Sequence, residues 1–195
     1  MKILILDTSD EKSFIALVTD DTVDFRMLPD NSRQSLSLFP TLLALLADNH
    51  TRPADLACIA VGNGPGAFTG TRIGVMTAKT MSYASRCPII TFCSLKKYVA
   101  KEEGPFSVIG DAKSRGFYVL KGYRTEHKVT YNQQAITEND KTLLESDRCI
   151  SGSSSVEFAE LVDPTIDQLI PLIKSELSSM NRMNARAEVQ YLSTP

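Results

Sequence analysis

The segment from Gly62 to Gly74 constrains the fold of this chain more than any other part of the sequence. It reads G-N-G-P-G-A-F-T-G-T-R-I-G, with five glycines and one proline. An apolar run at 57–61 precedes it, and a run of helical character at 75–84 follows it. This order predicts a strand, a glycine-rich turn and a helix. Glycine allows positive φ or a close approach of the backbone to another group, and the free N–H groups that begin a helix suit an anion.

The turn does not match the common nucleotide-binding fingerprints. It has no Gly-Lys-Ser/Thr as in a P-loop, and its glycine spacing is not G-x-G-x-x-G. Two interpretations stay open. The glycines either shape a tight turn against a close helix, or they let the backbone approach a ligand. On the second interpretation Thr69, Gly70 and Arg72 are candidates for contact with a nucleotide or another anion, because they flank the start of the helix.

The order of the expected elements favours a mixed α/β sheet. Helices are predicted at 33–48 and 72–85, and a last one at 166–180. Strands are predicted at 2–7, 13–19, 22–28, 57–62 and 88–92. Three strands followed by alternating helices and strands fit a ribonuclease-H-like or actin-like fold, in which helices cover the faces of the sheet.

A weak internal repeat supports a duplicated fold. The apolar strand 3–7 ends in Asp7 and precedes the strand 14–17, and 107–111 ends in Asp111 and precedes 117–120. Actin-like kinases and ATPases are built on this plan, with the two Asp residues facing a nucleotide cleft. The expected organisation is a first actin-like domain at 1–95, a reduced second one at 96–165, and a C-terminal helix and tail at 166–195 that pack back on the first domain.

Composition removes several classes of function. The chain has 195 residues, 43% of them hydrophobic and 23% charged, and a formal net charge of −2. This charge disfavours an RNA-binding module that works alone. No apolar run is long enough to span a membrane. His50 and His127 are isolated, so no histidine-built metal site is expected, and no G-x-S-x-G turn supports a serine hydrolase.

The two predicted helices carry more apolar or small residues than one contact requires. The leucines and the phenylalanine of 33–48 cover roughly 180° of the helix, whereas packing on one sheet needs about 100°. Small residues line one face of the second helix, which permits close approach of another helix. The simpler alternative is that both helices pack only on their own sheet and on each other. The alternative with a partner predicts an interface at Leu38, Leu42, Leu45, Gly74, Ala78 and Ser82.

The complete glycine-rich string is more specific than its spacing. The pattern G-x-G-P-G-x-F-T-G-x-R-I-G-x-x-x-A-K, from Gly62 to Lys79, closely resembles the TsaB (YeaZ) family. The segment 5–9 resembles the opening strand and turn of that family, 111–115 with Tyr118 its D-A-R…Y segment, and 191–192 its terminal Y-L-R. The chain departs at 34–35, where His-Ser is usual, and at Ser193, where Arg is usual. It is also short for the family, mostly between about 123 and 163.

The resemblance implies a non-catalytic subunit of bacterial tRNA N6-threonylcarbamoyladenosine (t6A) synthesis. Such a subunit is cytoplasmic and pairs with a TsaD-like transferase, whose histidine pair binds metal. It also works with a TsaE-like ATPase, and it can form a homodimer when alone. It would reach tRNA only through the complex, meet ATP only there, and hold no metal or cofactor by itself. The alternative is an actin-like ATPase or small-molecule kinase that acts alone through Asp7, Asp111 and the glycine-rich turn.

Overall fold

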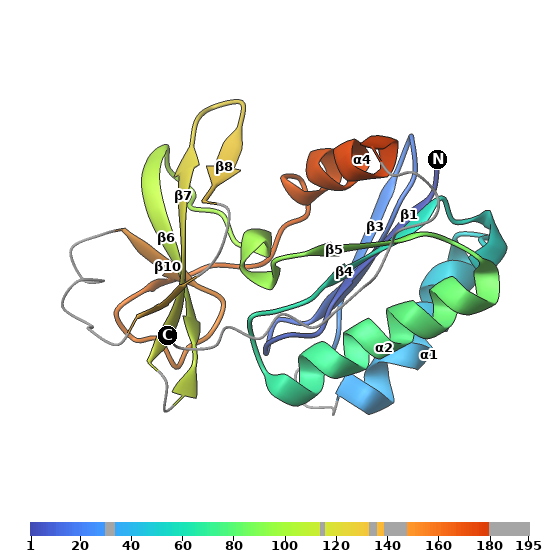
Figure 1. Ribbon diagram of the computed structural model, residues 1–195, viewed down its shortest axis with the longest axis horizontal. Helices are drawn as coiled ribbons and strands as arrows, with labels where there is room; N and C mark the ends of the chain where they lie inside the picture. Colours follow the sequence, from blue (N-terminus) through green and yellow to red (C-terminus); the bar gives the residue numbers. More distant parts are fainter. Residues whose placement is uncertain (30–33, 114–115, 133–135, 139–147, 180–195) are drawn as a thin grey trace.

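The chain folds into two lobes joined by a short connector (Figure 1). The computed structural model describes residues 1–29, 34–113, 116–132, 136–138 and 148–179. The sheet of the first lobe has the order β3-β2-β1-β4-β5. β1 pairs antiparallel with β2 and parallel with β4. The strands are β1 (Ile3–Asp7), β2 (Phe14–Val18), β3 (Val23–Met27), β4 (Cys58–Gly62) and β5 (Ile89–Phe92).

The second lobe is built on a sheet with the order β11-β10-β6-β7-β8, and β9 also pairs with β7. β6 pairs antiparallel with β7 and parallel with β10. The strands are β6 (Gly104–Asp111), β7 (Phe117–Arg124), β8 (Val129–Tyr131), β9 (Ile136–Glu138), β10 (Cys149–Ser151) and β11 (Glu160–Leu161).

The two sheets repeat one arrangement. β1 ends at Asp7, which lies opposite Phe14 on β2, and β6 ends at Asp111, which lies opposite Phe117 on β7. In each lobe the first strand of this hairpin also has a parallel neighbour, β4 or β10. The prediction of an α/β fold with duplicated mixed sheets is therefore confirmed.

Helices cover both faces of the first sheet (Figure 1). α1 (Gln34–Asp48) and α2 (Phe68–Ser85) lie together on one face, and α4 (Leu169–Ser179) lies on the other. The described residues also include the 3-10 turns η1 (Pro53–Asp55) and η2 (Ser94–Lys97). α2 begins at Phe68 rather than at the predicted residue 72, because the extended backbone of the turn ends at Ala67. No helix among the described residues is both long and apolar enough to cross a membrane.

The core of the first lobe follows the alternation of side chains along its strands. In β1, Leu4 and Leu6 pack in the cluster under α1 and α2, whereas Ile3 and Ile5 pack in the cluster under α4. A strand buried on both faces reads as a continuous apolar run, as β1 does. Ile166, Leu169 and Ile173 belong to this second cluster, so the segment after the second sheet returns to the first lobe. Residues 180–195, with the Tyr191-Leu192 motif, lie outside the described residues.

Two buried thiols give a prediction for alkaline pH. Burial raises the pKa of the Cys58 thiol to about 12, and that of Cys87 to about 11, from an ordinary value of 9.0. Both thiols stay neutral in the fold where the unfolded chain ionises. The free energy of unfolding should therefore fall as the pH rises from about 9 toward 11.

The measurement is chemical denaturation across this pH range, with Cys58→Ala/Cys87→Ala as the reference protein. The loss of stability above pH 9.0 should be smaller in the double variant. Native protein at neutral pH should also resist iodoacetamide at both thiols, whereas protein in concentrated urea should react, because the thiolate is the nucleophile. Equal alkylation rates in the native and unfolded states would contradict this assignment.

Candidate functional site

The glycine-rich turn packs directly against the loop that joins β1 to β2. A Cβ atom on Gly62 would lie 1.7 Å from Asp7 Oδ2, and one on Gly66 would lie 2.3 Å from the carbonyl oxygen of Ser9. Gly64 has a φ of 98°, in the left-handed region that favours glycine. The backbone N–H of Gly64 donates to Ser94 Oγ at 2.9 Å, and the N–H of Ala67 donates to the Ser9 carbonyl. Protein groups therefore fill the space and accept these two hydrogen bonds, which supports a structural role for the turn.

The five residues predicted near a nucleotide or anion do not gather at one place. Asp7 is buried. The carbonyl of Gly70 accepts a hydrogen bond from Thr8 Oγ1 at 2.7 Å, within the first turn of α2. Thr69 and Arg72 are exposed, and the Arg72 guanidinium lies over the Phe68 ring, 3.5 Å from its centroid.

Asp111 is the member of this set that lines the cavity between the lobes. Its carboxylate accepts hydrogen bonds from Lys113 Nζ at 2.8 Å and from Ser155 Oγ at 2.9 Å. Although partial burial opposes ionisation, these hydrogen bonds lower the pKa of Asp111 below its usual value. The carboxylate is thus charged and already bound by groups of its own lobe.

The interlobe cavity has a volume of about 480 Å³. Both lobes line it. The β1–β2 loop, the glycine-rich turn (Pro65, Gly66 and Ala67) and the start of α2 contribute from the first lobe, and the ends of β6 and β10 contribute from the second. Its charged and aromatic lining consists of Asp10, Glu11, Phe68, Tyr98, Asp111, Lys113 and Tyr118. Acidic side chains therefore outnumber basic ones in the wall, which disfavours the phosphate groups of a nucleotide.

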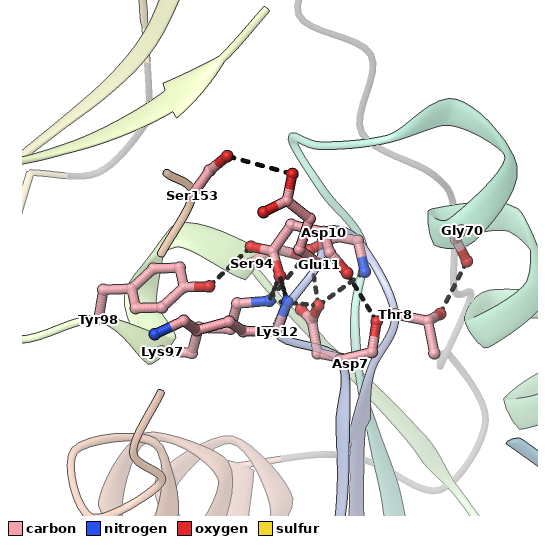
Figure 2. Close-up of polar contacts among 12 residues, drawn as sticks. Asp7, Thr8, Asp10, Glu11, Lys12, Gly70, Ser94, Lys97, Tyr98 and Ser153 are labelled. Carbon is pink, nitrogen blue, oxygen red and sulfur yellow. Dashed lines mark hydrogen bonds and ion pairs between the residues drawn. The ribbon is translucent and has the colours of Figure 1, made fainter. Parts of the chain in front are cut away.

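A buried lysine that the sequence did not reveal contacts the β1–β2 loop (Figure 2). Lys97 ends η2, and its side chain is 0% exposed. Its Nζ atom lies 2.9 Å from Asp7 Oδ1, 2.8 Å from Asp10 Oδ1 and 3.4 Å from Ser9 Oγ. Desolvation opposes the charged form, but the carboxylates of Asp10 and Asp7 outweigh it and raise the pKa of Lys97. Lys97 is therefore an ammonium ion at neutral pH.

The neighbouring Tyr98 extends the same network into the second lobe. Its hydroxyl donates to Asp10 Oδ2 at 2.9 Å, while its ring lies in the core of the second sheet. Burial, together with the charge of Asp10, raises the pKa of Tyr98 above its usual value. A Cβ atom on Gly152 would lie 1.9 Å from the Tyr98 hydroxyl oxygen, so this residue must be glycine for the ring to fit. Asp10 thus links the first lobe to the connector and the second core.

No group of three or more His, Cys, Asp or Glu side chains capable of holding a metal ion occurs among the described residues. His50 ends the α1 region with an exposed side chain, and His127 is exposed in the loop before β8. The two histidines thus lie in different lobes.

The side chains predicted at the partner interface lie mostly inside the first lobe and pack on its own core. Leu38, Leu42 and Leu45 are at most 2% exposed, and Ala78 is 0% exposed, in the cluster between the helices and the first sheet. Gly74 packs on Thr8, with its Cβ position 2.4 Å from Thr8 Oγ1. Ser82 is half-buried, and its hydroxyl donates to the Cys87 carbonyl.

The same two helices nevertheless present a different apolar surface to the exterior. Its residues follow helical spacing, at i, i+3 and i+7 on α1 and at i and i+7 on α2. We call this surface the outer helical face, and it consists of Leu36, Phe39 and Leu43 on α1 and Met76 and Tyr83 on α2, each more than half exposed.

Comparisons with known proteins agree with the fold and the motif. The family model described as TsaD, tRNA N6-adenosine threonylcarbamoyltransferase, matches residues 31–146. The tRNA threonylcarbamoyladenosine biosynthesis protein TsaB of Bacillus subtilis is 34% identical over 156 residues, which are 76% of this chain and 68% of that protein. The Escherichia coli TsaB protein is 28% identical over 69% of this chain and 60% of its own length.

Solved structures resemble the whole described architecture. YeaZ from Pseudomonas aeruginosa superposes with a TM-score of 0.76 at 19% identity, covering 98% of this chain and 99% of that one. A second Pseudomonas aeruginosa structure, of an uncharacterized protein with similarity to peptidase YEAZ, has a TM-score of 0.80 and the same identity and coverage. The fold and its repeated hairpins define an α/β protein of the duplicated actin-like class. Within that class, the chain belongs to the TsaB family.

Proposed function

We propose that this chain is a non-catalytic partner subunit in the synthesis of t6A at adenosine 37 of tRNA. The observation that carries the proposal is its 34% identity to the Bacillus subtilis protein, whose name places that protein in threonylcarbamoyladenosine biosynthesis. The match to a family model described as the transferase supports a partner of similar fold.

The outer helical face supports association with a transferase subunit. Five large apolar side chains on two adjacent helices are costly to leave in water unless a partner covers them. A TsaD-like subunit with its own pair of helices would complete a helical bundle against α1 and α2. In the absence of that subunit, the same face would support a homodimer.

The proposed complex divides the chemistry between subunits. The TsaD-like transferase provides the metal ligands and the transfer step, and a TsaE-like ATPase joins the larger assembly. This chain would reach tRNA only through the complex, in the cytoplasm, and would meet ATP only there. The ion pair between Lys97 and Asp7 supports this division, because it occupies the carboxylate that an actin-like ATPase would use.

Reconstitution tests this proposal directly. The purified chain, the transferase and the ATPase subunit of the same organism are mixed with tRNA, threonylcarbamoyl-adenylate and ATP, and t6A is measured by nucleoside mass spectrometry. Omission of the chain should abolish product formation, and the chain alone should hydrolyse no ATP. ATP turnover by the pure chain that Asp111→Ala abolishes would support the actin-like ATPase alternative instead.

A further inference from the structure

The actin-like class implies a nucleotide and its divalent cation in the cleft between the lobes, near the Asp that ends the first strand. The residues of this chain do not fit that group. Asp7, the relevant side chain, is 0% exposed and does not line the cavity. Its Oδ1 atom accepts hydrogen bonds from the Ser9 N–H, the Ser9 hydroxyl and Lys97 Nζ. A cation that approached from the cavity would have to displace the lysine first.

We propose that the Lys97 ammonium is a built-in cation, which takes the place of a divalent ion between Asp7 and Asp10 and keeps a metal–nucleotide complex out of the cleft. An ammonium group has three N–H donors, and three oxygens lie around Nζ, at 2.8, 2.9 and 3.4 Å. Each N–H donor of the Lys97 ammonium group therefore has an oxygen acceptor. Two carboxylates and one hydroxyl, with water, are also the ligand types that Mg²⁺ accepts in proteins.

The surroundings hold Lys97 in this position. Its backbone carbonyl accepts a hydrogen bond from the Thr165 N–H at 2.8 Å, which ties η2 to the segment that leads to α4. The next residue, Tyr98, is anchored in the core of the second lobe and donates to Asp10. These contacts fix the backbone of Lys97 and keep its ammonium group within reach of both carboxylates.

One carboxylate oxygen beside Lys97 has no hydrogen-bond partner. Asp7 Oδ2 is buried without a hydrogen bond, and it lies against the backbone of Gly62. A buried carboxylate that loses its counter-ion must either take up a proton or gain another cation. If Lys97 loses its charge, the site therefore contains two carboxylates that can capture a metal.

The test is a gain of metal binding in Lys97→Met, which keeps most of the length of the side chain and removes the ammonium group with its charge. In EDTA this variant should melt below the wild type. Added Mn²⁺ or Mg²⁺ should then raise its melting temperature by about 5 °C or more, since a ligand that binds only the folded state stabilises it. Mn²⁺ electron paramagnetic resonance should show one bound ion per chain in the variant and none in the wild type.

Two further variants control this measurement. Lys12→Met removes a nearby lysine whose ammonium group binds the Val162 carbonyl and Asp163 rather than Asp7. This variant should show no metal response. Asp7→Asn/Lys97→Met removes one proposed metal ligand together with the lysine, and should lose the metal response of the single variant.

Each outcome decides for or against the proposal. A folded Lys97→Met protein without metal dependence overturns it, and so does an equal Mn²⁺ response in the wild type. If Lys97→Met does not fold with or without Mn²⁺, the deciding measurement is calorimetry of the wild type with Mg²⁺ and ATP. Binding of Mg²⁺ and ATP at the cleft would contradict the proposal, and the absence of binding would support it. The proposal deepens the non-catalytic role proposed above, yet its test needs no transferase, so the two can fail separately.

Discussion

Replacing Phe39 and Met76 with glutamate should abolish t6A formation in the reconstituted system while leaving the subunit folded. The two side chains are 56% and 59% exposed on adjacent helices, so charge is tolerated there in the free chain. At an interface with a partner, each buried glutamate loses its hydration without a counter-ion. Together they should weaken binding to the transferase subunit by about 4 kcal/mol, roughly 1,000-fold in Kd.

Calorimetric binding and nucleoside mass spectrometry measure the two effects, and a melting curve controls for folding. The matched control is Leu161→Glu, because Leu161 is 52% exposed but lies on β11 in the second lobe. That variant should bind and support t6A as the wild type does. Wild-type affinity in a folded Phe39→Glu/Met76→Glu protein would place the interface elsewhere on the surface.

The strands of the first sheet could be predicted from the sequence because their apolar runs are local and strong, whereas β8, β10 and β11 are too short to give such a signal. β1, β2 and β4 are buried along their whole length; polar residues bound β1 and β2, and β4 ends at Gly62. The repeat of an Asp after a short apolar strand also predicted the paired hairpins correctly. These signals depend on side-chain alternation and turn chemistry, which are encoded within a few residues.

The burial of the residues proposed for the interface could not be predicted, because helical periodicity gives the direction of a side chain and not its neighbours. The wide apolar arc of α1 was interpreted as one sheet contact plus one partner contact. In the structure Leu38, Leu42 and Leu45 face the sheet and α2, whereas Leu36, Phe39 and Leu43 point outward. Periodicity cannot decide which edge of such an arc faces the core, because that depends on how the two helices pack together.

The position of Ala78 on α2 shows the same limit of helical periodicity. Ala78, one of the small residues of the predicted interface, is 0% exposed in the core cluster under α1 and α2, and Ala78→Arg would place an arginine there. The arginine would have to be buried without a partner, so it would unfold the chain and say nothing about association.

Lys97 was missed because a lysine between Lys96 and Tyr98 resembles an exposed connector. Lysine is almost never fully buried unless it is paired, and its partners, Asp7 and Asp10, lie about ninety residues away in the chain. Only the folded topology brings the connector back to the β1–β2 loop. To predict this ion pair from the sequence, one would first have to know that Asp7 is buried and needs a cation. The residues next to Asp7 in the sequence give no sign that its cation is Lys97.

Gly62→Ala should be among the most destabilising single-methyl changes in this chain. The added Cβ would lie 1.7 Å from Asp7 Oδ2 and 2.6 Å from Asp7 Cγ. Gly62 ends β4 and pairs with Phe92 on β5, which fixes its backbone, so the carboxylate must move and lose its contact with Lys97. Overpacking together with a broken buried ion pair should reduce the free energy of unfolding by about 4 kcal/mol.

A double-mutant cycle with Asp7→Ala separates this cause from a general intolerance of Gly62 to substitution. Asp7→Ala alone should also destabilise, because it leaves Lys97 with Asp10 as its remaining carboxylate partner. It removes the atoms that the new methyl group would strike, however, so Gly62→Ala should cost about 1 kcal/mol or less in that background. Urea denaturation of the four proteins measures the coupling. Additive losses would mean that the glycine is required for another reason, such as its contact with Ser94 Oγ, 2.7 Å from the Cβ position.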